Sequence, residues 1–360
     1  MSYPFRDTLH RSRKAVVHRL DRLWPQASFE EVTERLHYRT RPPYAGPGPA
    51  VMPEQAIEGL ADRAEAEDEE AVFRVKGPCT VDPKMGLLFV NGRVVWGSTD
   101  NHVRERNPKY LGHMMRPVER LPSAILLHHI HGDNYFHFFT LIMNRVRVIE
   151  GLGLPDEIPF LVTENTASTR FFQEAVKLGI FGGRKVVVQG RKTVCRVDEA
   201  YVVRGFFLYR PYLDWICDRL GVPGTQADGA PLFVIRKPSA ANGRIFRNQQ
   251  AVNDLVGRYG FDLIDPGDLS FKDQVHTFSR APAIAGAHGA GLTNLIFRRS
   301  PPCTLVELFF PGMGSPHYYM LAREKGFGYA SMMTDDPQGR AFTASTHVDL
   351  DQLKAILDTL

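Results

Sequence analysis

A glycine-rich turn between an apolar strand and a helix is the segment with the clearest potential for chemistry. It spans residues 283–294 and reads AIAGAHGAGLTN. Glycine lets the backbone approach a ligand closely, and a helix N-terminus offers unpaired N–H groups with partial positive charge. The turn therefore predicts a phosphate or pyrophosphate site, and the alternative is a tight turn that needs glycine for geometry alone. Neither GxGxxG nor GxxxxGK[ST] is present, which disfavours a nicotinamide cofactor and ATP.

A basic segment precedes this turn and follows another apolar strand. Its four cations are Arg236, Lys237, Arg244 and Arg247. Guanidinium groups match phosphate oxygens bidentately, and cations can stabilise a departing diphosphate without a metal. In a doubly wound sheet, this segment and the glycine turn would share one edge. The two segments together favour a diphosphate site over an ordinary solvated basic loop.

Two further features concern carboxylates near the expected nucleotide. Glu307 ends the apolar run TLVEL, where a carboxylate can accept hydrogen bonds from ribose hydroxyls; an ordinary salt-bridged glutamate is the alternative. Asp265 and Asp268 occur as DPGD, which indicates a turn. We therefore expect no carboxylate-bound metal at the diphosphate.

A histidine-rich stretch, His128–His137, lies between a strand and a helix in the first half of the chain. It invites a metal interpretation, but it lacks a fixed-spacing motif such as HExxH. We favour a polar rim of a ligand cleft, in which Asp133 or His137 takes a proton from an acceptor hydroxyl. Hydrogen-bonded structural histidines are the alternative.

The elements that position these residues form two successive βαβα runs, which predicts an α/β fold with two facing doubly wound domains and a cleft between them. We expect a helical and linker segment over 1–70, an α/β domain over 71–220, a second over 221–345 and a closing helix over 346–360. Within the first domain, Asn91-Gly92 between two apolar runs predicts a small antiparallel hairpin appendage.

Composition limits the functional class. The 360 residues carry 44 Lys and Arg against 40 Asp and Glu, a net charge of +4 that does not favour a nucleic-acid partner. Four widely spaced cysteines without a CxxC pair favour a reducing compartment. No apolar run is long enough to span a membrane. Residues 1–24 can form a basic amphipathic helix, which either docks on the body or contacts a membrane surface.

Four stretches resemble the family 61 glycosyltransferases. They are DNYFHFF at 133–139, RIFRN at 244–248, LSFKDQVHTFSRAPAIAGAHGAGLTNLIF at 269–297 and LVEL at 305–308. The resemblance covers roughly residues 72–335. It implies a GT-B fold, with Rossmann-like domains for acceptor and nucleotide-sugar at the bounds given above. It also implies inverting transfer of a pentose or N-acetylhexosamine from a nucleotide-sugar, most readily a UDP-sugar, without a metal or other cofactor.

Carried over residue by residue, the resemblance implies a donor site and an acceptor side. The expected donor-binding residues are Arg236, Arg244, Asn248, His288, Gly289, Ala290, Gly291, Thr293, Asn294 and Glu307. His137 would lie at the acceptor side. Many relatives carry an acidic residue four positions later, where this chain has Leu141, so the base stays open between Asp133 and His137.

The expected partners are a nucleotide-sugar donor and a glycan or glycolipid acceptor, with no nucleic acid. The chain resembles a bacterial-type member that serves capsular or exopolysaccharide assembly in the cytoplasm, with peripheral contact to the inner face of the membrane through residues 1–24. Two other functions stay open. One is a non-catalytic nucleotide-sugar or glycan-binding protein, suggested by Leu141; the other is a metal-dependent hydrolase built on His128–His137.

Overall fold

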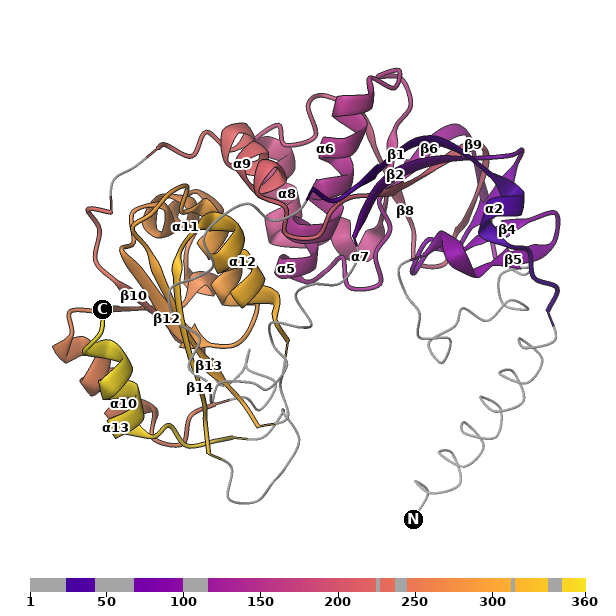
Figure 1. Ribbon diagram of the computed structural model, residues 1–360. Helices are drawn as coiled ribbons and strands as arrows, with labels where there is room; N and C mark the ends of the chain where they lie inside the picture. Colours follow the sequence, from indigo (N-terminus) through magenta and orange to yellow (C-terminus); the bar gives the residue numbers. More distant parts are fainter. Residues whose placement is uncertain are drawn as a thin grey trace, which may run out of the picture. The chain divides into compact units, whose positions relative to one another are not determined.

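The computed structural model describes residues 24–42, 68–99, 116–224, 227–236, 245–311, 315–335 and 345–360. These residues fall into two compact units (Figure 1). Unit 1 contains the described residues up to Arg41 together with Glu69–Phe206. Unit 2 contains Pro42, Asp68 and the described residues from Phe207 to Leu360. The amphipathic helix expected over 1–24 lies outside the described residues except for Trp24. Within the described ranges, no helix has the length and apolarity that a membrane crossing requires.

Unit 1 is built on a nine-stranded mixed sheet. Its strands are β1 (Thr33–Thr40), β2 (Glu69–Val75), β3 (Cys79–Val81), β4 (Leu88–Val90), β5 (Arg93–Val95), β6 (Val118–Leu126), β7 (Phe160–Thr163), β8 (Val186–Gln189) and β9 (Val194–Arg204). Its helices are α2 (Phe29–Val32), η1 (Trp96–Ser98), α5 (Tyr135–His137), η3 (Phe138–Ile142), α6 (Met143–Leu152), α7 (Glu164–Ala167) and α8 (Arg170–Lys177). Strands β9, β6, β7 and β8 are parallel neighbours, as the βαβα pattern predicts.

The Asn91-Gly92 hairpin is present between β4 and β5, and both residues have positive φ, 49° and 75°. The prediction of a separate appendage is wrong, however. β4 pairs with β3, and β3 pairs with β9, so the hairpin continues the main sheet. The expected helical segment over 1–70 also contains strand β1, which pairs with β2. Long strand β9 joins these parts, because β2 and β3 pair along one edge and β6 along the other.

The helix expected after the histidine-rich stretch begins where the sequence suggests. The side chain of Asn134 caps α5 by accepting from the N–H groups of Phe136 and His137. The helix then widens into the π-helical turn η3 before α6. Helix α6 ends at Leu152, where the C-cap Gly153 takes the left-handed conformation with φ 67°.

Unit 2 is built on a five-stranded parallel sheet. Its strands are β10 (Leu232–Val234), β11 (Asp262–Ile264), β12 (Ala283–Ala287), β13 (Thr304–Phe309) and β14 (Gly328–Met333), in the order β11-β10-β12-β13-β14. Its helices are α9 (Arg210–Arg219), α10 (Gln249–Arg258), η4 (Pro266–Asp268), α11 (Phe271–Ser279), η5 (Ala290–Phe297), α12 (His317–Lys325) and α13 (Leu350–Leu357). The chain reverses its direction of sheet growth between β10 and β12. Ligands of doubly wound sheets bind at this kind of switch point, beyond the carboxyl ends of the strands.

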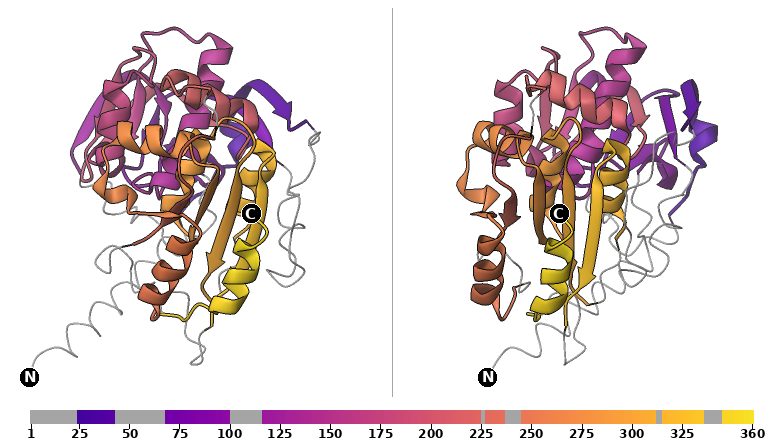
Figure 2. Two further views of the ribbon diagram at one scale, coloured as in Figure 1. Left: turned by 90° about the vertical axis from the view of Figure 1, so that its left-hand side faces the viewer. Right: turned by 60° about the vertical axis from the view of Figure 1, so that its left-hand side comes forward.

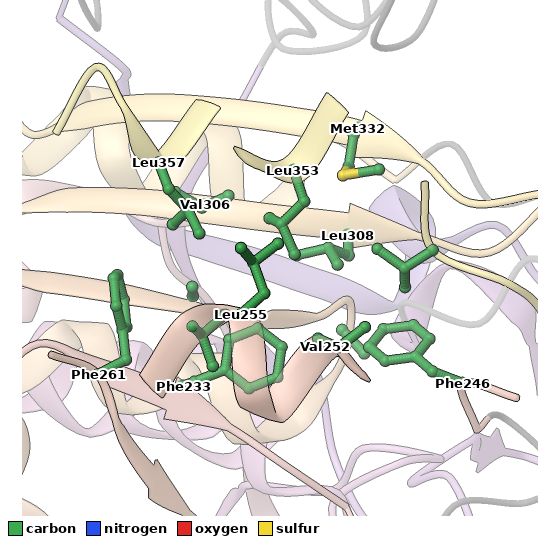
Figure 3. Close-up of a cluster of buried hydrophobic side chains, with 14 of the residues drawn as sticks. Phe233, Phe246, Val252, Leu255, Phe261, Val306, Leu308, Met332, Leu353 and Leu357 are labelled. Atoms are coloured by element: carbon green, nitrogen blue, oxygen red, sulfur yellow. The ribbon is translucent and has the colours of Figure 1, made fainter. Parts of the chain in front are cut away.

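One face of this sheet packs against α10 and α13, which lie side by side (Figure 2). Val252 and Leu255 of α10 and Leu353 of α13 meet strand residues such as Val306 in a buried apolar cluster (Figure 3). Burial of this kind contributes about 25 cal/mol per Å² of apolar surface and is the main force that fixes the strands. The core thus holds the carboxyl ends of β10 and β12 in a defined place.

Helix α9 is an element that the sequence did not predict, and it belongs to unit 2. The Cys217 thiol donates to the Ile296 carbonyl, and Arg299 pairs with Asp218 at 2.5 Å. These contacts explain why the units divide at Phe206/Phe207, upstream of the expected boundary at 220/221.

Candidate functional site

The glycine turn after β12 lies against the arginine that follows β10. The Arg236 Nη2 atom donates to the His288 carbonyl at 3.4 Å. A Cβ atom placed on Gly289 would lie 1.5 Å from Arg236 Nη2, and Gly289 has φ 152°. The backbone conformation favours glycine here, and a side chain at this position would displace the Arg236 guanidinium. The predicted convergence of the two segments is present for Arg236, at the switch point of the sheet.

The turn opens helix η5, a 3₁₀ helix that starts at Ala290. The first turn of a helix leaves backbone N–H groups without an intrahelical acceptor. Ala290 and Gly291 occupy that first turn and are only partly buried. Together with the Arg236 guanidinium, these N–H groups form a cationic and dipolar surface suited to an anion.

Thr293 and Asn294, two of the expected donor-binding residues, brace the glycine turn. Both side chains are buried. The Thr293 hydroxyl hydrogen-bonds the Tyr318 hydroxyl at 3.1 Å, and the Asn294 amide donates to the Gly291 carbonyl at 3.1 Å. The Tyr318 hydroxyl in turn donates to the Gly289 carbonyl at 2.7 Å. These hydrogen bonds fix the backbone path of the glycine turn.

Glu307, expected near ribose hydroxyls, is bonded to two protein side chains. Its side chain is fully buried within strand β13. The His288 Nδ1 atom lies 2.5 Å from Glu307 Oε1, and the Tyr329 hydroxyl donates to Glu307 Oε2 at 2.6 Å. Both oxygens therefore already have protein partners. The His288 ring also stacks on Phe309, with centroids 5.2 Å apart, and meets the Tyr318 ring edge-on.

Asn248, one of the expected donor-binding residues, bonds to the backbone of Val348. Its side-chain amide donates to the Val348 carbonyl at 2.8 Å and accepts from the Val348 N–H at 3.0 Å. It thereby ties the start of α10 to the segment before α13. Arg244, the other cation expected at the diphosphate, lies outside the described residues.

Two aspartate pairs of unit 2, Asp265 with Asp268 and Asp349 with Asp351, lie at a turn and at a helix start. Asp265 Oδ1 accepts from the Gly267 N–H at 2.9 Å, which confirms the predicted turn. The sequence contains one Asp-x-Asp triplet, Asp349–Asp351, a spacing of carboxylates that could suit a metal ion. Asp349 caps α13 by accepting from the N–H groups of Asp351 and Gln352.

The histidines of unit 1 divide into one structural residue and a stacked group. His128 is buried and its Nε2 atom bonds Gln189 Oε1 at 2.8 Å. Burial lowers the pKa of His128 to about 4. The rings of His129 and His137 stack with centroids 5.0 Å apart, and the His131 ring lies 5.4 Å from that of His137. The cleft-rim role expected for this stretch remains a prediction.

The two candidate bases lie in this same turn. Asp133 is exposed, while His137 is half-buried at the start of the helix. The pKa of His137 is lowered to about 4, chiefly by burial and also by His131, while Asp133 opposes the shift. His137 is thus a neutral imidazole at pH 7, able to accept a proton. Among the residues that the structure describes, no group of three or more His, Cys, Asp or Glu side chains is arranged to hold a metal ion.

Comparison with known proteins bears on this arrangement. The family described as Glycosyltransferase 61 matches residues 135–306. The match supports a family 61 glycosyltransferase. The matched range contains His137, Arg236 and the turn at His288, and it ends one residue before Glu307.

A stretch of 64 residues is also 39% identical to a beta-1,2-xylosyltransferase of Arabidopsis thaliana. This stretch covers 18% of the present chain and 12% of the plant protein. It supports the same enzyme class over a short part of the chain.

Tyr318 and Tyr329 are site residues that the sequence did not reveal. Tyr318 lies on α12 and Tyr329 on β14, both distant in sequence from the glycine turn. No local motif marks either residue. Pairing of β14 with β13 brings Tyr329 to Glu307, and packing of α12 against η5 brings Tyr318 to Gly289.

Proposed function

We propose that this chain is an inverting glycosyltransferase that moves a sugar from a nucleotide-sugar to a hydroxyl group of a glycan or glycolipid. The observation that carries the proposal is the contact between Arg236 and the His288–Gly289 turn at the switch point of a parallel sheet. This arrangement gathers positive charge and N–H groups where a doubly wound sheet binds ligands. The family match over residues 135–306 supports the same reaction class.

In the proposed reaction, an acceptor oxygen attacks C1 of the donor sugar while a base removes the hydroxyl proton. The bond between C1 and the phosphate oxygen breaks, and the nucleoside diphosphate leaves with both electrons of that bond. Arg236 and the N–H groups at Ala290 and Gly291 stabilise the negative charge that develops on the leaving group. No metal is needed in this scheme, because the charge is neutralised by the protein.

His137 and Asp133 are the proposed bases. A neutral imidazole can take the acceptor proton, and Asp133 favours the imidazolium that results. We propose a UDP-sugar donor with a pentose or N-acetylhexosamine. The xylosyl transfer named for the plant relative supports a pentose. Surface-polysaccharide synthesis, in the cytoplasm and at the inner membrane face, is the proposed setting.

A non-catalytic sugar-nucleotide-binding protein is the second candidate. Leu141 stands where an acidic residue is expected, and the low pKa of His137 makes it a weak base. Thermal-shift measurements with UDP-, GDP-, CMP- and dTDP-sugars would identify the donor, because a bound ligand stabilises the folded state by mass action. Mass spectrometry of the best donor with acceptor glycans would then detect transfer. Stabilisation together with transfer or donor hydrolysis supports the enzyme, whereas stabilisation without turnover supports the binding protein.

A further inference from the structure

Three buried side chains, Tyr329, Glu307 and His288, form a continuous hydrogen-bonded chain in unit 2. Glu307 stands at its centre, with Oε1 2.5 Å from His288 Nδ1 and Oε2 2.6 Å from the Tyr329 hydroxyl. Glu307 is 0% exposed, and Tyr329 is 1% exposed. A carboxylate so deeply buried is costly unless both oxygens are hydrogen-bonded. His288 and Tyr329 supply these two hydrogen bonds to Glu307.

The direction of each proton follows from the chemistry of the three groups. Burial raises the pKa of Tyr329 well above its ordinary value, and Glu307 also raises it. The phenol therefore stays protonated and donates a hydrogen bond to Glu307. Glu307 can then accept from His288 only if the imidazole carries hydrogen on Nδ1. The carboxylate thereby selects one tautomer and one ring orientation, as the aspartate of a catalytic triad does.

Packing holds the ring in that orientation. The imidazole stacks on Phe309 at an interplanar angle of 25° and meets Tyr318 edge-on with centroids 5.4 Å apart. Within the described part of the chain, Nε2 has no protein partner, and the His288 side chain is 10% exposed. Nε2 is therefore the atom that the ring offers to a ligand at the glycine turn.

We infer that Glu307 and Tyr329 are positioning residues, which hold His288 with hydrogen on Nδ1 and present Nε2 to the nucleotide-sugar. This inference rests on the proposed function for the identity of the ligand. It assigns Glu307 an indirect role, through His288, in place of a direct contact with ribose. Tyr329 acts one step further away by fixing the second oxygen of Glu307.

The first test is nitrogen-15 NMR of the His288 ring in the full chain at alkaline pH, without ligand. We expect a neutral ring with hydrogen on Nδ1 in the wild type and a shift of the tautomer balance in Glu307→Gln, because the glutamine amide can donate to Nδ1. Tyr329→Phe should shift the same balance, because Glu307 Oε2 loses its donor, and Tyr319→Phe is its matched control, since Tyr319 packs edge-on against Tyr329. A wild-type ring with hydrogen only on Nε2 would overturn the inference whatever the ligand is.

The second test is a double-mutant cycle with UDP as the probe. We expect Glu307→Gln and His288→Ala each to weaken UDP binding about tenfold, and the double variant to bind no more weakly than His288→Ala. Additive losses would mean that Glu307 contacts the nucleotide independently, which would overturn the inference. If Glu307→Gln does not fold, Tyr329→Phe replaces it in the cycle. If wild-type protein binds no nucleoside diphosphate, the proposed function fails, while the NMR result still decides the positioning role.

Discussion

Arg236 lies so close to Gly289 that a single added methyl group at Gly289 would overlap the guanidinium, with 1.5 Å between the new Cβ and Nη2. The two residues come from segments that follow different strands, β10 and β12. Their contact joins the basic segment to the glycine turn and defines the proposed diphosphate site.

Gly289→Ala should therefore displace Arg236 and weaken UDP binding by about tenfold or more. Calorimetric titration with UDP measures this effect. Gly260→Ala is the matched control, because Gly260 has φ 78° and nothing within 4 Å of a new Cβ. The control should lose about 1–2 kcal/mol of stability from backbone strain and bind UDP normally. Equal UDP binding by Gly289→Ala and the wild type would show that the contact does not serve the ligand.

His128 should make the stability of the protein fall in mild acid. Its side chain is buried and its pKa is lowered to about 4 from 6.5, so the unfolded chain binds a proton in a range where the folded chain does not. The free energy of unfolding should therefore be unaffected by this residue above pH 6.5 and should decrease as the pH falls toward 4, by up to about 3 kcal/mol. Denaturant titrations of the wild type and His128→Gln at several pH values test this. An identical pH dependence in both proteins would contradict the assignment.

His137→Ala and Asp133→Asn should lower kcat more than donor affinity, because both residues are assigned to the proton transfer. Steady-state kinetics with the donor found by thermal shift would separate the two effects. Unchanged kcat in both variants would remove them as candidate bases.

His131→Ala should change the acid limit of turnover. Burial is the main cause of the low pKa of His137, and His131 adds to it. If neutral His137 is the base, wild-type kcat should fall only as the pH approaches about 4. Removing His131 should move that limit upward, toward 6.5. A limit that does not move in this variant would argue that another group takes the proton.

Local signals in the sequence predicted much of unit 2. Ser270 caps α11 by accepting from the Asp273 N–H, a contact that the spacing of these two residues favours. Strand β12 and the turn that follows it also lie where the apolar run and the glycines place them. These features depend on neighbouring residues, so a single sequence contains their signal.

The unpredicted elements depend on distant partners. Helix α9 is held by residues such as Ile296 and Arg299, which lie about eighty positions away in sequence. Strand β14, GYASMM, lacks a clear alternating pattern and is fixed by pairing with β13. The apolar run around Glu307 predicted its strand, but the residue lies within β13 and not at the strand's end, and its hydrogen bonds to His288 and Tyr329 could not be predicted.

The most direct test of the account compares the binding of UDP and uridine to the wild type, Arg236→Ala and His288→Ala by calorimetry. Because the proposed site recognises the diphosphate, the wild type should bind UDP much more tightly than uridine. Each variant should lose about tenfold in UDP affinity and keep its uridine affinity. Wild-type protein that binds UDP no better than uridine, or variants that bind UDP as the wild type does, would contradict the account.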